Sequence, residues 1–302
     1  MTVRPSIGRA LDWSALAILK IRAREVAEGV FAGSHRSARR GAGVEFGGFR
    51  EYVRGDDLRW LDRRSLLRHE RLVIRQFETE TDRALCLVVD ASASMAFRGP
   101  TADFPKVAYA SILAAALARV ALSGGDPVSL SFIGAESFGA PVPRAASSEQ
   151  FDRVVASLDA VRPGGDTYVD RAMLSRALDA VAHTTRRGAV VVVFSDLLDA
   201  AEGAAERVAA LALGGRVLVV VQVLDPAEMD LPYRGTVRLR ALEGTAEVET
   251  DADAARAGYR ARLGEITGSW ERAVVRRGGR FLRASTADNP LQVVRTLLDR
   301  LQ

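Results

Sequence analysis

Residues 85–94 have the sequence LCLVVDASAS, and this stretch decides the predicted fold. Its apolar run, Leu85–Val89, is short and unbroken and ends at a carboxylate, which predicts a strand that is buried on both faces of a sheet. Further strands are predicted at 128–133, 189–194 and 217–224, the last two of which are mostly apolar. Longer segments with helical character lie between them. The alternation therefore predicts an α/β fold with a doubly wound, mostly parallel sheet of the Rossmann type.

The rest of the chain divides into parts around this core. We expect an N-terminal extension (1–82) with a helix and a charged segment, a central α/β core (83–235), and a C-terminal part (236–302) that completes the fold. The C-terminal part is expected to contain a hairpin, a long helix, and a final strand and helix. The predicted helices cover residues 11–31, 106–123, 151–161, 168–184, 201–213, 253–277 and 289–301, and further strands cover 71–77, 236–242, 246–249 and 281–283.

The composition is that of an ordinary globular protein, with 48% apolar residues and a net charge of +4. Cys86 is the only cysteine, which excludes an internal disulfide and a thiolate zinc site and favours a reducing compartment. The longest uninterrupted apolar runs are far shorter than the roughly 20 residues of a spanning helix. The first residues also lack the apolar stretch of a signal peptide. We therefore expect a cytoplasmic protein with no membrane insertion.

Three predicted loops carry small oxygen-bearing side chains. Asp90, Ser92 and Ser94 follow the first strand, Asp196 follows the third, and Thr167 lies between them, just ahead of a helix. The carboxyl ends of parallel strands share one edge of the sheet, where ligands bind, so we expect these groups to lie together. Hydroxyl and carboxylate oxygens are ligands that suit Mg²⁺ or Mn²⁺. We predict that the three hydroxyls coordinate such an ion directly, while the two carboxylates hold bound waters.

This arrangement leaves one coordination position open, which invites an Asp or Glu from a partner protein. Each group also has a second interpretation, because Asp and Ser after a strand commonly cap the next helix. Thr167 with Asp170, three residues later, resembles a capping box. The five residues together favour the metal site.

The set formed by Asp90, Ser92, Ser94, Thr167 and Asp196 resembles the metal-ion-dependent adhesion site (MIDAS) of von Willebrand factor type A domains. An upstream signature has the pattern GxEFxxxRxYxxGDDxRxxD over residues 43–62 and RLxxRxFExE over residues 71–80. It resembles the bacterial and archaeal family named for domain of unknown function 58 (DUF58), whose members are similar to type A domains.

The DUF58 resemblance carries further expectations. Members are commonly encoded beside MoxR-type AAA+ ATPases, which implies such an ATPase as a partner. This chain has Arg63 where the family usually has tryptophan. It also lacks the two membrane helices that many members carry before the signature, which places it among the soluble members.

The resulting hypothesis is a non-enzymatic, metal-dependent protein-interaction module that acts as an adaptor of a MoxR-type ATPase and binds an unknown client with an acidic ligand. Arg50, Asp56, Asp57 and Arg59 of the signature form either a docking surface for the ATPase or an internal charge network.

Two other functions remain open. One is a Mg²⁺-dependent hydrolase with Asp90 as nucleophile or base, although no phosphate loop or other complete catalytic motif is present. The other is nucleic-acid binding through the arginine-rich first 80 residues, against which the interleaved acidic residues argue.

Overall fold

The computed structural model describes residues 84–134, 140–165, 172–198 and 203–301, and the backbone of two further strands at 45–51 and 73–78. The main unit is built on one sheet of six strands. These strands are β3 (Leu85–Ala91), β4 (Val128–Gly134), β5 (Val142–Ala145), β6 (Val190–Ser195), β7 (Val217–Leu224) and β10 (Arg280–Ser285).

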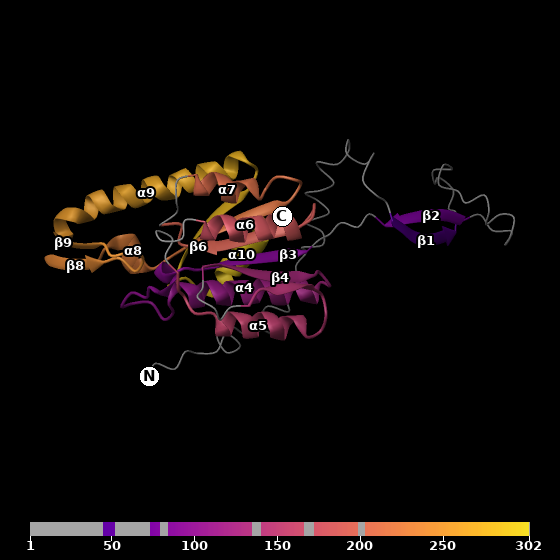
Figure 1. The fold of residues 1–302 in the computed structure, drawn as a ribbon, viewed down its shortest axis with the longest axis horizontal. Helices are drawn as coiled ribbons and strands as arrows, with labels where there is room; N and C mark the ends of the chain where they lie inside the picture. The colour runs from indigo at the N-terminus through magenta and orange to yellow at the C-terminus, as the bar shows by residue number, and fades with distance from the viewer. Residues whose placement is uncertain are drawn as a thin grey trace. The chain divides into compact units, whose positions relative to one another are not determined.

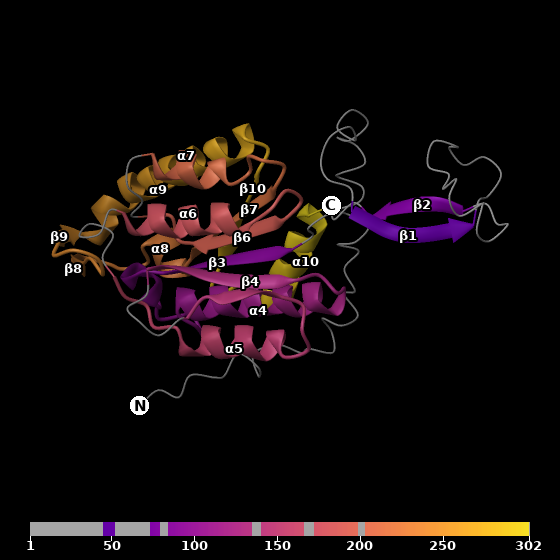
Figure 2. The same ribbon diagram turned by 45° about the vertical axis from the view of Figure 1, so that its right-hand side comes forward.

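The sheet has the spatial order β10-β7-β6-β3-β4-β5. Figure 1 labels β6, β3 and β4 of this sheet, and Figure 2 labels β7 and β10 as well. All neighbouring strands are parallel except β5, which pairs antiparallel with β4 at one edge. The order reverses beside β3, the first strand of the sheet along the chain, as in other doubly wound sheets. The predicted α/β class with a mostly parallel sheet is therefore confirmed.

Helices cover both faces of the sheet (Figure 2). One face carries α4, α5 and α10, and the other carries α6, α7 and α9. Their bounds are α4 (Lys106–Ser123), α5 (Gln150–Ala160), α6 (Met173–Thr184), α7 (Ala204–Ala210), α9 (Ala252–Arg276) and α10 (Pro290–Arg300).

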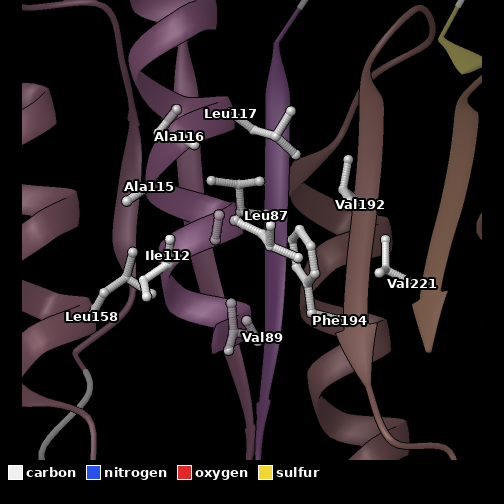
Figure 3. Packing of buried hydrophobic residues seen from close by; sticks show 14 of the residues in the cluster. Leu87, Val89, Ile112, Ala115, Ala116, Leu117, Leu158, Val192, Phe194 and Val221 are labelled. Atoms are coloured by element: carbon white, nitrogen blue, oxygen red, sulfur yellow. The ribbon is translucent and has the colours of Figure 1, made fainter. Parts of the chain in front are cut away.

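Strand β3 contributes side chains to two hydrophobic cores, because successive side chains of a strand point to opposite faces of the sheet. Leu87 and Val89 pack with Phe194 of β6 against α4, as Figure 3 shows. Cys86 and Val88 point to the other face, toward α6, α7 and α9. Burial raises the pKa of the Cys86 thiol. Both-face burial explains the unbroken apolar sequence of this strand.

Helix α4 is the one helix in the described part of the chain that is long and apolar enough to cross a membrane. It is also largely buried, from its first residue, Lys106, onward. Its central residues are small alanines, which let the helix backbone approach the sheet closely. In this structure α4 is therefore a core helix of the main unit.

The C-terminal part extends the main unit beyond the sheet. A short helix, α8 (Pro226–Asp230), follows β7, and the antiparallel hairpin of β8 (Thr236–Arg240) and β9 (Glu247–Asp251) comes next. Helix α9 starts directly after β9, where the Asp251 carboxylate caps it by accepting a hydrogen bond from the N–H of Ala254 at 2.9 Å.

Two strands upstream belong to a separate compact unit, Val30–Asp82. They are β1 (Glu45–Glu51) and β2 (Val73–Glu78), which pair antiparallel. A strand close to β2 was predicted, whereas β1 was not. The predicted helix at 11–31 lies outside the described residues.

Inside the main unit the sequence missed β5 and α8. Strand β5 is a four-residue edge strand whose first residue alone is buried, so it carries no apolar run. Helix α8 has five residues and is defined by the cap at Asp225 and the proline after it. Such short elements are set by local capping and edge pairing, which leave little periodic signal in the sequence.

The core packing gives a first prediction. Leu87→Ala removes a fully buried side chain at the centre of the sheet and should lower the free energy of unfolding by about 2–5 kcal/mol. The matched control is Leu213→Ala, whose side chain is exposed and should cost less than about 0.5 kcal/mol. Urea unfolding followed by circular dichroism measures both, and equal losses would contradict the core assignment.

Candidate cation-binding site

The carboxyl ends of β3 and β6 form one wall of a small pocket. Its polar lining comes from three places in the chain, and its remaining walls are apolar. The polar lining residues are Asp90, Ser92, Ser94, Ser195, Asp196 and Glu243. All six are buried, and three of them are carboxylates and three are hydroxyls. Buried polar groups of both kinds need hydrogen-bond partners, and an ionised carboxylate also needs a nearby positive charge. The pocket is thus a buried polar site at the edge where a parallel sheet binds ligands.

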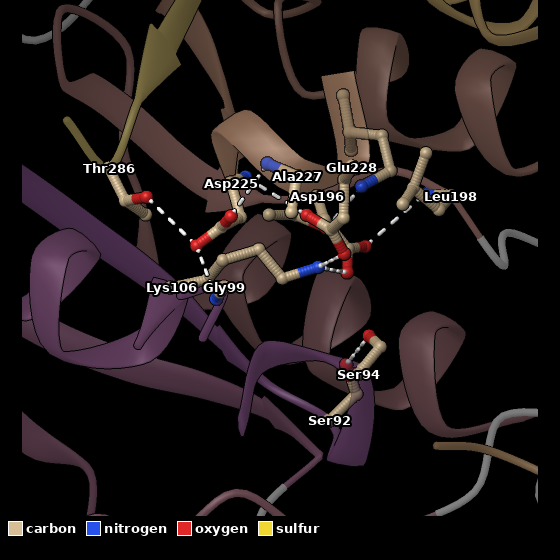
Figure 4. A network of polar contacts seen from close by, with 12 residues as sticks. Ser92, Ser94, Gly99, Lys106, Asp196, Leu198, Asp225, Ala227, Glu228 and Thr286 are labelled. Carbon is tan, nitrogen blue, oxygen red and sulfur yellow. Dashed lines mark hydrogen bonds and ion pairs between the residues drawn. The ribbon is translucent and has the colours of Figure 1, made fainter. Parts of the chain in front are cut away.

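The loop after β3 positions the first part of this site. The N–H of Ser92 donates a hydrogen bond to Asp90 Oδ1 at 2.9 Å, which bends the chain back toward the end of the strand. The hydroxyl oxygens of Ser92 and Ser94 lie 3.1 Å apart and face each other (Figure 4). On the other side of Asp90, the Ser195 hydroxyl donates to Oδ2 at 2.5 Å. Both carboxylate oxygens of Asp90 are therefore held by neighbours.

Glycines bring the neighbouring loops close to this turn. The N–H of Gly164 donates to the carbonyl of Ala91 at 2.8 Å, and the N–H of Ala93 donates to the carbonyl of Gly165 at 3.2 Å. Gly134 has a φ of +73°, and a Cβ added there would lie 2.9 Å from the nitrogen of Ser92. Only glycine fits this position without displacing the backbone.

A buried lysine anchors the third part of the site. Lys106, the first residue of α4, donates from Nζ to Asp196 Oδ2 at 2.7 Å and to Glu228 Oε1 at 2.5 Å (Figure 4). Its side chain is fully buried. Burial alone lowers the pKa of Lys106, but the charges of Asp196 and Glu228 outweigh burial and raise it. The ammonium is therefore charged, and it ties α4 to the end of β6 and to α8.

A fully buried carboxylate lies behind this lysine. Asp225 caps α8 by accepting from the N–H of Ala227 at 2.8 Å, and its other oxygen accepts from the N–H of Gly99 at 2.8 Å and from the Thr286 hydroxyl at 3.3 Å. A Cβ at Gly99 would lie 2.1 Å from Asp225 Oδ1, so this contact requires glycine. Asp225 therefore has a structural role, because both of its carboxylate oxygens accept hydrogen bonds from the surrounding chain.

Electrostatics distinguishes the two aspartates of the pocket. Burial and the neighbouring charge of Asp196 raise the pKa of Asp90 to about 6, although hydrogen bonds from Ser195 and Ser92 lower it. Asp196 and Glu228 both accept hydrogen bonds from the Lys106 ammonium, and Asp196 Oδ1 also accepts one from the N–H of Leu198 at 3.2 Å. A nearby positive charge would therefore favour the ionised form of Asp90.

One distance in the pocket can be compared with the coordination geometry of a small divalent cation. Two ligands on adjacent corners of a Mg²⁺ octahedron lie about 3.0 Å apart for bonds of about 2.1 Å, and the hydroxyl oxygens of Ser92 and Ser94 are 3.1 Å apart. Asp90 and Asp196 already accept hydrogen bonds on both oxygens, yet each oxygen has a second lone pair for a water. Within the described residues, no group of three or more acidic, histidine or cysteine side chains is arranged to hold a metal ion by itself, so a cation here would also need the hydroxyls.

The predicted site residues divide into two groups. The structure brings Asp90, Ser92, Ser94 and Asp196 into one pocket. Thr167 lies outside the described residues, as do Asp56, Asp57 and Arg59 of the signature, and Arg50 falls on β1, where only the backbone is described.

Sequence reasoning missed four polar residues of this region, namely Lys106, its partner Glu228, Ser195 as a partner of Asp90, and Glu243. Lys106 did leave a signal, because it is one of two lysines in a chain whose other basic residues are all arginine, and it opens an apolar helix. Glu243 left none, since it lies among other charged and polar residues of the C-terminal part.

The fold and this pocket define a doubly wound α/β protein with a polar site at the carboxyl edge of its sheet. The sequence profile of the protein of unknown function DUF58 matches residues 48–266, which is more than half of the chain. The chain therefore belongs to the DUF58 family, as its signature predicted.

Similar proteins span most of this chain. An uncharacterized protein of Mycobacterium tuberculosis is 31% identical over 80% of this chain and 74% of its own length. An aerotolerance-related membrane protein of Bacteroides fragilis has a solved structure that is 17% identical, covers 72% of this chain and 98% of its own, and has a TM-score of 0.44. A von Willebrand factor type A structure from Catenulispora acidiphila is 10% identical, covers 76% of this chain and 43% of its own, with a TM-score of 0.35.

The lysine network gives a second prediction. Lys106→Met keeps the side-chain volume but leaves the buried carboxylate of Asp196 and the half-buried one of Glu228 without their cation, so it should destabilise the fold by about 3–5 kcal/mol. Arg260→Met breaks the exposed pair of Arg260 with Asp230 and should cost less than about 1 kcal/mol. Urea unfolding curves of both variants test this, and a stable Lys106→Met protein would refute the anchoring role.

Proposed function

We propose that this chain is a metal-dependent protein-interaction module that binds Mg²⁺ or Mn²⁺ at the pocket. The observation that carries the proposal is the pair of buried hydroxyls, Ser92 and Ser94, whose oxygens lie 3.1 Å apart beside Asp90 and Asp196. In this proposal the serines, with Thr167, bind the ion directly, and the two aspartates hold its waters.

The choice of ligands sets what such a site does. Three neutral hydroxyls neutralise little of the ion's charge, so the bound cation attracts a carboxylate of a partner to its open position. Asp90 is held in place by Ser92 and Ser195, and Asp196 by Lys106 and Leu198. The protein therefore holds four groups of the site in place before a partner binds. Little of the partner's binding free energy is then lost to ordering these groups.

We infer the partner proteins from the family signature. Its resemblance to proteins encoded beside MoxR-type AAA+ ATPases supports an adaptor role, in which Arg50, Asp56, Asp57 and Arg59 dock the ATPase and the metal site binds an acidic client. The burial of α4 in the main unit, together with the single buried cysteine, supports a cytoplasmic location.

Metal binding is the direct test. Titration calorimetry with Mg²⁺ and Mn²⁺ should give one site in the full chain, and Asp90→Ala/Ser92→Ala should weaken it about a hundredfold or more. The matched control is Asp152→Ala/Ser148→Ala, which changes the same residue types at exposed positions and should bind as the wild type does. Equal binding by the wild type and the site variant would refute the proposal.

Affinity purification from the native host separates the two partners. With Mg²⁺ present, the wild type should recover a MoxR-type ATPase and a client, while Asp90→Ala/Ser92→Ala should retain the ATPase and lose the client. Asp57→Ala/Arg59→Ala should lose the ATPase, and the control Arg262→Ala, at an exposed position of α9, should lose neither. Recovery that is the same for all four proteins would contradict the adaptor role.

A further inference from the structure

The hairpin of β8 and β9 contains one buried residue, and that residue is an acid. From Pro232 to Asp251 every residue is exposed or half-buried except Glu243, which is 3% exposed. Its neighbours in the turn are exposed, and Leu242 is 50% exposed. A hairpin tip that turns its leucine to solvent and its carboxylate inward reverses the usual preference of both side chains.

The inward carboxylate reaches the candidate site. Glu243 lines the same pocket as Asp90, Ser92, Ser94 and Asp196. Its Oε1 accepts a hydrogen bond from the N–H of Ser94 at 3.2 Å, a contact between residues 149 positions apart in the chain. The hairpin tip therefore lies over the turn that carries both hydroxyls.

We propose that Glu243 is the chain's own acidic ligand of this site: it takes the position expected for a partner's carboxylate, and an acidic partner enters by displacing the hairpin tip. The inference rests on the proposed cation site and adds to it an internal competitor. A cation held by Ser92 and Ser94 would lie in the same small, buried pocket as Glu243, where opposite charges attract more strongly than in water.

Tethering makes this competitor effective. A carboxylate on the same chain acts at an effective concentration in the millimolar range or above, without the loss of translational freedom that a separate partner incurs. A weak or isolated acid is thereby excluded, while a partner that also contacts the exposed hairpin, including Leu242 and Val248, can replace it. The hairpin thus selects for partners with a wider interface than one acidic side chain.

Mn²⁺ with acetate as the probe tests the inference on the full chain. Glu243→Gln retains an oxygen that can accept from Ser94 but loses the charge, so its Mn²⁺ affinity should fall about tenfold or more. Glu243→Ala should show the same loss, together with a higher water-proton relaxation rate per bound Mn²⁺, because water takes the vacated position. The matched control is Glu249→Gln, an exposed acid of the same hairpin, which should behave as the wild type.

Acetate then replaces the missing side chain. It should raise the Mn²⁺ affinity of Glu243→Ala and lower its relaxation rate, with no such effect on the wild type. If Asp90→Ala abolishes Mn²⁺ binding while both Glu243 variants match the wild type in affinity and relaxation, the inference fails and the cation site stands. If Asp90→Ala binds Mn²⁺ as the wild type does, the cation site fails and the inference fails with it.

Discussion

The contacts on which this arrangement depends are the two ion pairs that the buried Lys106 makes with Asp196 and Glu228. They join the start of α4, the end of β6 and helix α8, three elements that are distant in sequence. A buried ammonium is tolerated only when its partners and geometry are satisfied, so the three elements must meet in one way. The same contacts place the Asp196 carboxylate in the pocket beside Asp90, so that the stability of the fold and the shape of the site have a common origin.

The sequence predicted the sheet well because its strands are buried on both faces. Unbroken apolar runs such as Leu85–Val89 and Val217–Val221 carry a strong signal, and the predicted bounds of the helix at 106–123 agree with α4. The order of strands could not be read from these runs, since any of them could neighbour any other. The edge strand β5 was missed because one-sided burial over four residues leaves no periodic pattern.

The candidate site was predictable to the extent that it lies just after strands. Asp90, Ser92, Ser94 and Asp196 were found by the rule that ligands bind at the carboxyl edge of a parallel sheet, and the pocket contains all four. Glu243 follows no such rule, because its place in the pocket depends on how the β8–β9 hairpin folds back over a turn 149 residues earlier. Long-range contacts of this kind are set by tertiary packing, which local pattern does not encode.

The location of Cys86 has a practical consequence. It is the single thiol of the chain, it lies buried in the central strand β3, and burial disfavours its thiolate. Alkylating and maleimide reagents attack the thiolate, so the folded protein offers them no accessible native target. A cysteine introduced on the β8–β9 hairpin would carry a fluorophore or spin label by itself, without removal of the natural residue.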